Sequence, residues 1–281
     1  LEGDTLYYDK KLGIGKARHN MVFRDTLENI ILLAHSGDFF ERDSSVLATD
    51  SAVFISWEGT DSLYLHGDTL FTKKDSLLGR EIQAYYGVRF YRYDMQGVCD
   101  SLYYCEKDSL MRMYDKPCLW TDSTQMTAEY IQFTIDRNEI RELFMKDNAF
   151  IVSLYEELDF QQVKGAQMRG YFNNNNLDHM RVIGNAEAVY FIDDENGAKT
   201  GINKSSSASM DLFFEESEVT VINMAGSPQG TIYPNKQLSS EQRMLAGFEW
   251  RSALRPMNKN DIFRKATPVN TGGVVRGNSN P

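Results

Sequence analysis

Residue types that carry out catalysis are present in this chain, but their spacing matches no catalytic or metal-binding motif. The histidines His19, His35, His66 and His179 are scattered and form neither a His-x-His nor a His-Glu-x-x-His pattern. The chain also lacks a Cys-x-x-Cys pair, a Gly-x-Ser-x-Gly elbow and a glycine loop of the phosphate-binding kind. We therefore predict no enzyme activity, no bound metal and no cofactor.

Two carboxylate clusters resemble a glycosidase pair or a calcium site at first sight. They are Asp193-Asp194 and the run Glu215-Glu216-x-Glu218. Adjacent residues of a strand point to opposite faces, so neighbouring carboxylates do not converge on one substrate atom. We interpret both clusters as solvated turns.

Charge and hydropathy exclude two further classes of function. The 281 residues include 40 acidic and 30 basic side chains, for a net charge of −10. Phosphate neutralisation drives nucleic-acid binding, so this balance predicts no nucleic-acid partner. Runs of about 18 apolar residues, which a spanning helix needs, do not occur. Because the chain begins at Leu1 without a methionine, we expect a signal peptide to have been removed.

Alternation of apolar and polar residues dominates the stretch from Asp115 to Ile192. Successive side chains of a strand point to opposite faces, so a period of two predicts β-strands with one apolar face. That face meets either the protein's own core or an apolar ligand. The residues placed on it are Ile131, Phe133, Ile135, Met168, Phe172, Val182, Ala186, Ala188 and Tyr190.

Methionine is frequent, with 12 residues in the chain. Flexible thioethers suit an adaptable surface for acyl chains, and they also suit irregular gaps in a packed core. Composition alone favours the packed core. Met111 and Met113 nevertheless join the nine residues named above as candidates for a lipid-binding interior.

Short β-rich segments separated by turn residues continue from the start of the chain to residue 226. Turns are expected at Gly37-Asp38, Gly67-Asp68 and Asp147-Asn148, among other positions, and a loop is expected over residues 198–209. The chain contains no segment of helical length and period before residue 237. We predict an all-β fold, an antiparallel twisted roll or jelly roll of many short strands.

The last part of the chain has a different character. Ser239-Ser-Glu-Gln242 fits a capping box, and Met244, Leu245 and Phe248 would share one face of a short helix. We predict a β-roll over residues 1–226, with two fused repeats at about 1–98 and 99–226 as a further division. Residues 227–281 form a C-terminal extension with a short helix and a loose tail.

Several short phrases, in this order, resemble the OstA-like family of Gram-negative envelope proteins. They are Asp115-Lys-Pro-Cys-Leu-Trp120, Gln125-Met-Thr-Ala-Glu-Tyr130, Asn148-Ala149, Val163-Lys-Gly-Ala166 and Asn185-Ala-Glu-Ala188. The chain looks like the branch that includes LptA and the N-terminal domain of LptD, in a Bacteroidetes-type version. The resemblance covers most of residues 3–192, and the region after 226 departs from it.

The resemblance implies a periplasmic or outer-membrane-associated protein that shelters the acyl chains of lipopolysaccharide, or of its lipid A part, inside the roll. It also implies partners among other Lpt-type envelope proteins, joined end to end by strand addition, and a possible homo-oligomer. An acidic chain repels an anionic glycolipid, so attraction must come from burial of acyl chains. The alternative is a structural or carbohydrate-contacting envelope domain with a closed core, and an enzyme on a β-roll ranks third.

Overall fold

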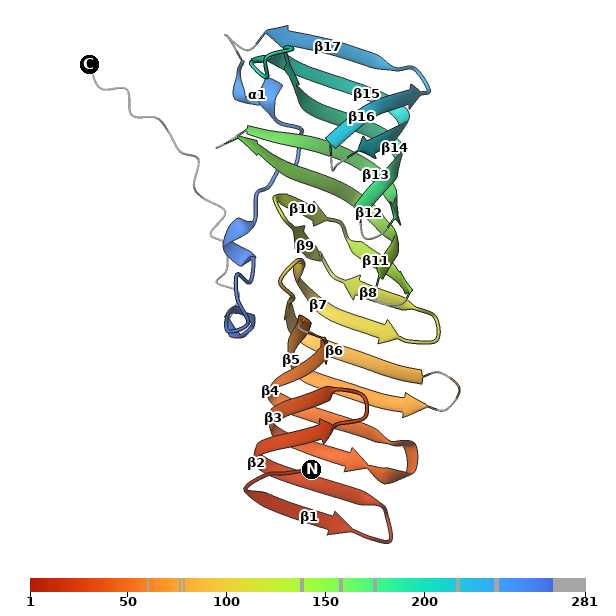
Figure 1. The fold of residues 1–281 in the computed structure, drawn as a ribbon, viewed down its shortest axis with the longest axis vertical. Helices are drawn as coiled ribbons and strands as arrows, with labels where there is room; N and C mark the ends of the chain where they lie inside the picture. The colour runs from red at the N-terminus through yellow and green to blue at the C-terminus, as the bar shows by residue number, and fades with distance from the viewer. Residues whose placement is uncertain are drawn as a thin grey trace, which may run out of the picture.

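The computed structural model shows an all-β protein built from one long antiparallel sheet of 17 strands (Figure 1). It describes residues 1–59, 61–75, 77, 79–136, 139–156, 159–173, 176–215, 218–234 and 238–264. The predicted fold class, an antiparallel twisted roll of many strands, is confirmed.

The strands, in chain order, are β1 (Thr5–Asp9), β2 (Ile14–Asp25), β3 (Ile30–Phe40), β4 (Ser45–Glu58), β5 (Asp61–Asp75), β6 (Gly79–Tyr91), β7 (Gln96–Cys105), β8 (Leu110–Tyr114), β9 (Cys118–Thr121), β10 (Thr124–Thr127), β11 (Tyr130–Asp136), β12 (Glu139–Glu156), β13 (Asp159–Asn173), β14 (Asn176–Asp193), β15 (Lys199–Glu215), β16 (Glu218–Ala225) and β17 (Gln229–Pro234). The helical segments are single turns: η1 (Glu41–Asp43), α1 (Ser240–Arg243), η3 (Ser252–Leu254) and η4 (Asp261–Phe263).

Most strands bend near their middle, so that each contributes one half to each of two facing walls. The short strands show this plainly, because β8 pairs with one half of β7 while β9 pairs with the other half. In the same way, β16 and β17 pair with opposite halves of β15. We call the wall that contains β1, β8, β11 and β16 wall 1, and the wall that contains β9, β10 and β17 wall 2. The main hydrophobic core lies between the walls.

Six of the corners between the walls contain pairs of residues in the left-handed backbone region. At these pairs the register of the ladder shifts, as between Lys146 and Ala149 of β12. Asn, Asp and Gly adopt positive φ at lower cost than other residues, because a short polar side chain or none avoids the clash of Cβ with the backbone. The corner pairs with positive φ are His19-Asn20, Asp50-Ser51, Tyr86-Gly87, Asp115-Lys116, Asp147-Asn148 and Gly184-Asn185.

Three of the predicted turns are wrong, because the chain does not reverse direction at them. Gly67-Asp68 and Asp147-Asn148 lie inside β5 and β12, where the strand crosses from one wall to the other. Gly37-Asp38 lies inside β3. Glycine at residue 37 leaves room for the Met21 side chain, because a Cβ there would stand 2.8 Å from the Met21 sulfur.

A β-branched residue at a corner should be costly to stability. Asn148 has φ 56° and an exposed side chain, so its replacement changes backbone strain with little change in packing. We expect Asn148→Val to lower the free energy of unfolding by about 1–2 kcal/mol, measured by urea denaturation. Asn148→Gly is the matched control and should be close to wild type, since glycine reaches positive φ freely. Equal stability of the two variants would contradict the proposed strain.

The loop expected over residues 198–209 is also wrong, because residues 199–209 belong to β15. The small, polar residues of this stretch are not typical of a β-strand. They are held by backbone hydrogen bonding on both sides, to β14 and to β17. Ser205 and Ser207 are 4% and 8% exposed, which shows that small side chains are accommodated under neighbouring elements.

Residues beyond 226 continue the sheet before they leave it. β17 pairs with β15 in the same sheet as the rest of the roll. The predicted domain division at 226, and the two repeats, stay predictions. The loose tail expected at the end of the chain lies outside the described residues, which stop at Arg264.

Residues 238–264 form a C-terminal strap that runs back along the roll (Figure 1). The predicted capping box is present: Ser239 Oγ accepts from the Gln242 backbone N–H at 3.3 Å, and Gln242 Oε1 accepts from the Ser239 N–H at 2.8 Å. The expected helical face of Met244, Leu245 and Phe248 is wrong, because Met244 is extended and the helix ends at Arg243. No helix in the described part of the chain is long and apolar enough to cross a bilayer.

Two buried glutamines bind the strap backbone to the outside of wall 2. Gln162 accepts from the Leu245 N–H and donates to the Arg243 carbonyl, both at 2.8 Å. Gln125 accepts from the Arg251 N–H at 2.6 Å and donates to the Glu249 carbonyl at 2.7 Å. Each side-chain amide makes the two hydrogen bonds that a neighbouring strand would otherwise make with the strap. Backbone N–H and C=O groups of the strap are therefore paired although the strap does not extend the sheet.

Apolar contacts fix the strap at both of its ends. Leu245 is 2% exposed and belongs to a second core cluster on the outer side of wall 2. At the other end the Phe263 ring lies 5.1 Å from the ring of His66. Burial lowers the pKa of His66 from its ordinary value, and the nearby Arg89 guanidinium lowers it further. The strap thus spans the sheet from β13 back to β5.

Candidate functional site

The eleven residues predicted to form an interior come from four strands of the sheet, β8, β11, β13 and β14, and ten of them meet between the walls. Seven are buried in the main core: Met113, Ile131, Phe133, Met168, Val182, Ala186 and Ala188. Met111, Ile135 and Phe172 are partly buried and pack against that core. These ten residues therefore share the apolar space between the walls. Tyr190 stands apart from the core cluster, and its hydroxyl accepts a hydrogen bond from Asn203 Nδ2 at 2.6 Å.

A cleft of about 860 Å³ opens between the walls in the C-terminal half of the roll. Its lining comes mostly from the inner faces of strands β10 to β16, and it also includes Gln162, Val189 and Phe191 from the outer side of wall 2. Wall 1 contributes apolar side chains that include Ile140, Phe172, Leu177, Leu212, Phe214 and Ile222. Wall 2 contributes Met126, Ile151, Val163 and Ala188, and Met95 extends the lining from the β6–β7 turn.

Only part of the predicted set reaches this cleft. Phe172, Ala188 and Tyr190 line it. Met168 and Val182 are at most 1% exposed and belong to the packed core. Their neighbours fill the space near the corners, so the interior is solid there and open toward the mouth. A role in ligand binding stays a prediction for every residue of the set.

The mouth of the cleft is rimmed by polar groups from strand ends and turns. On the wall 2 side, Arg92 makes a two-point ion pair with Asp94, with one contact at 2.9 Å. Farther along the same rim, the Tyr155 hydroxyl donates to Asp193. Thr121 and Thr124 add hydroxyl groups between them. An apolar interior with a polar rim suits a ligand whose chains enter and whose polar part stays in water.

The N-terminal half of the roll is more closed between its walls. The ring centroids of Phe23, from wall 2, and Phe39, from wall 1, lie 6.0 Å apart with an interplanar angle of 25°. Both rings pack against the main core. Stacked aromatic pairs at this distance stabilise the contact between two surfaces, so the walls meet here through side chains.

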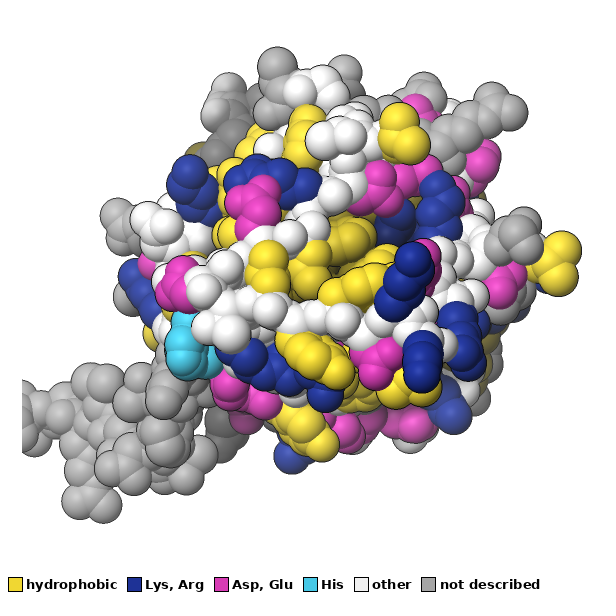
Figure 2. Space-filling view, turned by 90° about the horizontal axis from the view of Figure 1, so that it is seen from below, with side chains coloured by type: hydrophobic (Ala, Val, Ile, Leu, Met, Phe, Trp, Pro, Cys, Tyr) yellow, Lys and Arg dark blue, Asp and Glu magenta, His cyan; other side chains and the backbone are white. Residues whose placement is uncertain are grey.

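The end of the roll at β1 is also hollow and apolar. Figure 2, which looks at this end, shows hydrophobic side chains around a central depression. A pocket of about 350 Å³ lies there, lined by Leu1, Leu6, Tyr7, Tyr8, Gly15 and Phe39. Leu6 and Tyr8 are 56% and 53% exposed, although they follow the inward face of the sheet through their partners Ala17 and Gly15. The apolar interior therefore reaches the surface at this end.

The histidines considered for chemistry lie on different parts of the sheet, except His19 and His35, whose ring centroids are 4.8 Å apart. His179 lies on the outside of wall 1, stacked between Tyr171 and Phe213 and 2.9 Å from Asp211. Asp194 accepts from two backbone N–H groups of its own turn, as a solvated turn predicts. Glu216 and the side chain of Glu218 lie outside the described residues. Among the residues that are described, no group of three or more His, Cys, Asp and Glu could hold a metal ion.

Sequence reasoning missed the glutamine contacts to the strap and the corner pairs. The signal for the strap was the capping box at Ser239, which marks the start of an ordered segment. Nothing local distinguishes Gln162 from Gln161 and Gln167 of the same strand, which are more exposed, although Gln125 and Gln162 are both 1% exposed. Their partners lie 124 and 81 residues away.

Comparison with known proteins finds a weak structural similarity. The chain is similar to a solved structure from Pseudomonas aeruginosa, LptH, described as the LptA-homologous periplasmic component of the lipopolysaccharide transport device. The TM-score is 0.37 and the sequences are 13% identical, over 51% of this chain and 95% of that chain. No protein-family model matches the chain, and no curated protein matches it.

Proposed function

We propose that this protein is a non-enzymatic lipid carrier that shelters acyl chains in the cleft between its walls. The observation that carries the proposal is the cleft itself, about 860 Å³ with apolar side chains from both walls. Burial of one methylene group contributes about 0.8 kcal/mol, so roughly ten buried methylenes offset a large part of the cost of association. Contact is spread over many side chains, and no single one of them is essential.

The ligand class we propose is lipopolysaccharide or its lipid A part. Such molecules combine several acyl chains with a polar, anionic head, which fits an apolar interior behind a polar rim. The corresponding location is the periplasm or the periplasmic side of the outer membrane. The finer assignment, a Bacteroidetes-type member of the OstA-like family, is part of the same proposal and rests on the short sequence phrases described above.

The proposed partners are further β-roll proteins of the Lpt type, or second copies of this chain, joined end to end. β1 pairs along one side with β2 and forms one end of the sheet, where Leu6 and Tyr8 are exposed. Strands β16 and β17 form the other end, with Val221 and Ile232 at 47% and 66% exposure. Open edges are hazards unless they are used, and strand addition would continue both the sheet and its apolar interior.

Lipid analysis of the purified protein tests the proposal directly. We expect native mass spectrometry to show acyl lipid bound to the protein from a Gram-negative envelope, and added lipid A to bind the delipidated protein. Inner-face tryptophan or spin-label reporters near Leu212 should respond to the lipid, while reporters on the outside of wall 1 should not. Failure of any acyl lipid to bind would leave the structural or carbohydrate-contacting role as the better account.

A further inference from the structure

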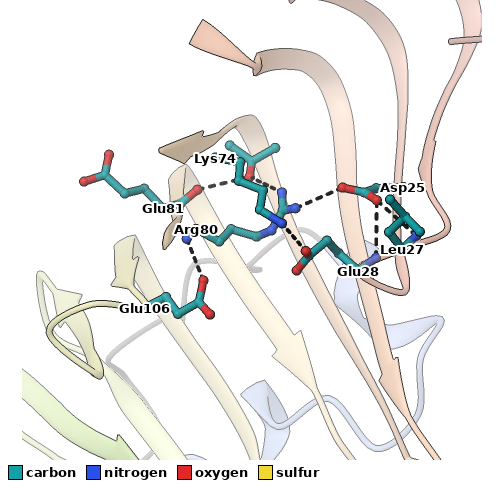
Figure 3. A network of polar contacts seen from close by, with 8 residues as sticks. Asp25, Leu27, Glu28, Lys74, Arg80, Glu81 and Glu106 are labelled. Atoms are coloured by element: carbon teal, nitrogen blue, oxygen red, sulfur yellow. Dashed lines mark hydrogen bonds and ion pairs between the residues drawn. The ribbon is translucent and has the colours of Figure 1, made fainter. Parts of the chain in front are cut away.

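The closed half of the roll contains a buried arginine whose hydrogen-bonding capacity is only partly used. Arg80 begins the inward row of β6 that continues with Ile82 and Ala84, and it is 7% exposed. Its Nη2 lies 3.1 Å from Asp25 Oδ2, and its Nη1 lies 3.4 Å from Thr72 Oγ1 (Figure 3). Its Nε is buried and has no hydrogen-bond partner among the described residues.

The contact of Arg80 with Asp25 joins the two walls across the mouth. Asp25 ends the half of β2 that lies in wall 2, and Arg80 belongs to wall 1. A second ion pair, between Lys74 of wall 1 and Glu28 of the β2–β3 turn, crosses beside it (Figure 3). We call these two ion pairs the latch. The lining of the C-terminal cleft includes Arg92, Asp94 and Met95 of the β6–β7 turn and none of the four latch residues.

The two sides of the latch differ in how easily they can separate. The Asp25 side chain is 24% exposed and already accepts from the Leu27 and Glu28 backbone N–H groups, so it keeps partners if it leaves Arg80. The Arg80 side chain is 9% exposed and would lose its one anionic contact. A guanidinium in such a place needs an anion, and phosphate or carboxylate oxygens match its fork as well as aspartate does.

We propose that the anionic head group of an acyl lipid replaces Asp25 on Arg80, which opens the latch and extends the cleft into the N-terminal half. The inference rests on the proposed lipid-carrier function and adds a head-group subsite to it. The group recognised is a phosphate or carboxylate attached to acyl chains, and Arg80 is the residue that binds it. Asp25 occupies the subsite in the lipid-free protein.

Two substitutions that break the same ion pair should act in opposite directions. Arg80→Gln removes the cation and keeps a side chain that can still donate to Thr72. Asp25→Asn removes the competing anion and leaves Arg80 free to receive the ligand. A latch with only a structural role would be weakened by both changes alike. Arg18→Gln is the matched control, since Arg18 forms an ion pair with Asp38 on the outside of the same wall at 2.8 Å.

The test compares lipid A with the same lipid after removal of its phosphates, titrated into the full chain by calorimetry. Wild type and Arg18→Gln should prefer the phosphorylated lipid by about tenfold, the size expected of a charge-assisted contact in a partly dry site. Asp25→Asn should increase that preference, and Arg80→Gln should abolish it while binding of the dephosphorylated lipid persists. Equal preference in wild type and Arg80→Gln, or equal changes in the two latch variants, would overturn the proposal.

Inorganic phosphate distinguishes a lipid head group from a free anion. At millimolar concentration it should compete weakly with phosphorylated lipid, because it carries no chains to bury. Competition at the affinity of the lipid itself would overturn the assignment to a lipid head group. If neither form of lipid binds wild type, the carrier function itself fails; if both bind equally well, only the subsite fails.

The distance between two spin labels measures directly whether the mouth opens. Leu27 and Leu77 are 93% and 80% exposed at turn positions on opposite sides of the latch, so cysteine substitutions there carry spin labels without disturbing packing. Phosphorylated lipid should shift the distance distribution between the labels to longer values, and Asp25→Asn should shift it without lipid. An unchanged distribution at saturating lipid would overturn the opening of the latch.

Discussion

Leu177→Arg is expected to lose most lipid binding while the protein remains folded. Leu177 lies on β14, lines the cleft and is partly buried against the core. An arginine there would place a charge and a long side chain across the space that acyl chains would fill. Because an uncompensated charge is costly in an apolar site, we expect lipid affinity to fall by at least about tenfold. Calorimetry with lipid A, or displacement of a fluorescent fatty acid, measures the loss.

Ile183→Arg is the matched control on the same strand. Ile183 is 46% exposed on the outside of wall 1, so the same new side chain points into water. Its lipid affinity should equal that of wild type. Circular dichroism and thermal unfolding of both variants separate blocked binding from misfolding. Equal affinity of the two arginine variants would mean that lipid does not occupy the cleft.

The choice of Leu177 over the buried methionines follows from the structure. Met168 is 1% exposed in the packed core, where an arginine would be expected to unfold the protein rather than block a ligand. Ala188 lines the cleft but is also 1% exposed. A residue at the border between packed core and open cleft gives the cleaner test, because its neighbours can move aside.

Leu245→Ala is expected to release the strap from wall 2. The side chain packs among Val152, Phe160 and Ile202 of the second core cluster. Truncation of a buried leucine leaves a cavity and costs about 2–5 kcal/mol, and the lower part of that range is expected because the strap can detach locally. Urea unfolding should report the loss of stability, and hydrogen exchange should become faster at the Leu245 and Arg251 amides.

Met257→Ala tests whether any shortening of a strap side chain has this effect. Met257 is 64% exposed, so little apolar surface is lost from the interface with the wall. Its stability and exchange rates should stay close to wild type. Protection at Leu245 and Arg251 that survives Leu245→Ala would show that the two glutamine contacts hold the strap without the apolar cluster.

The alternation of side chains along strands was readable from the sequence because it is a local property of an extended backbone. Ile131 and Phe133 are buried while Tyr130 and Gln132 are more exposed, as the period of two predicts. Burial then follows for the whole face at once, since a slip of one residue would expose every member of it. The capping box at Ser239 was equally local, because its two hydrogen bonds join residues three apart.

Local residue types do not distinguish a corner inside a strand from a turn at which the chain reverses. Asp147-Asn148 has the residue types of a hairpin turn, yet the chain continues across it into the other half of β12. The left-handed backbone at these two residues is compatible with either outcome. Pairing with β13 on both sides of the corner decides between them, and that pairing depends on residues far along the chain.

The amino-acid sequence by itself determined that this chain forms an antiparallel β-roll with one apolar face, because residue alternation and strand propensity act locally. Only the tertiary structure decided where the interior is solid and where it is open. Met168 and Leu177 belong to neighbouring strands and are both apolar, but one lies in the packed core and the other at the cleft. That difference follows from position along the strands, because Met168 lies next to the corner of β13 whereas Leu177 lies at the start of β14, and the pairing that fixes these positions joins residues on different strands.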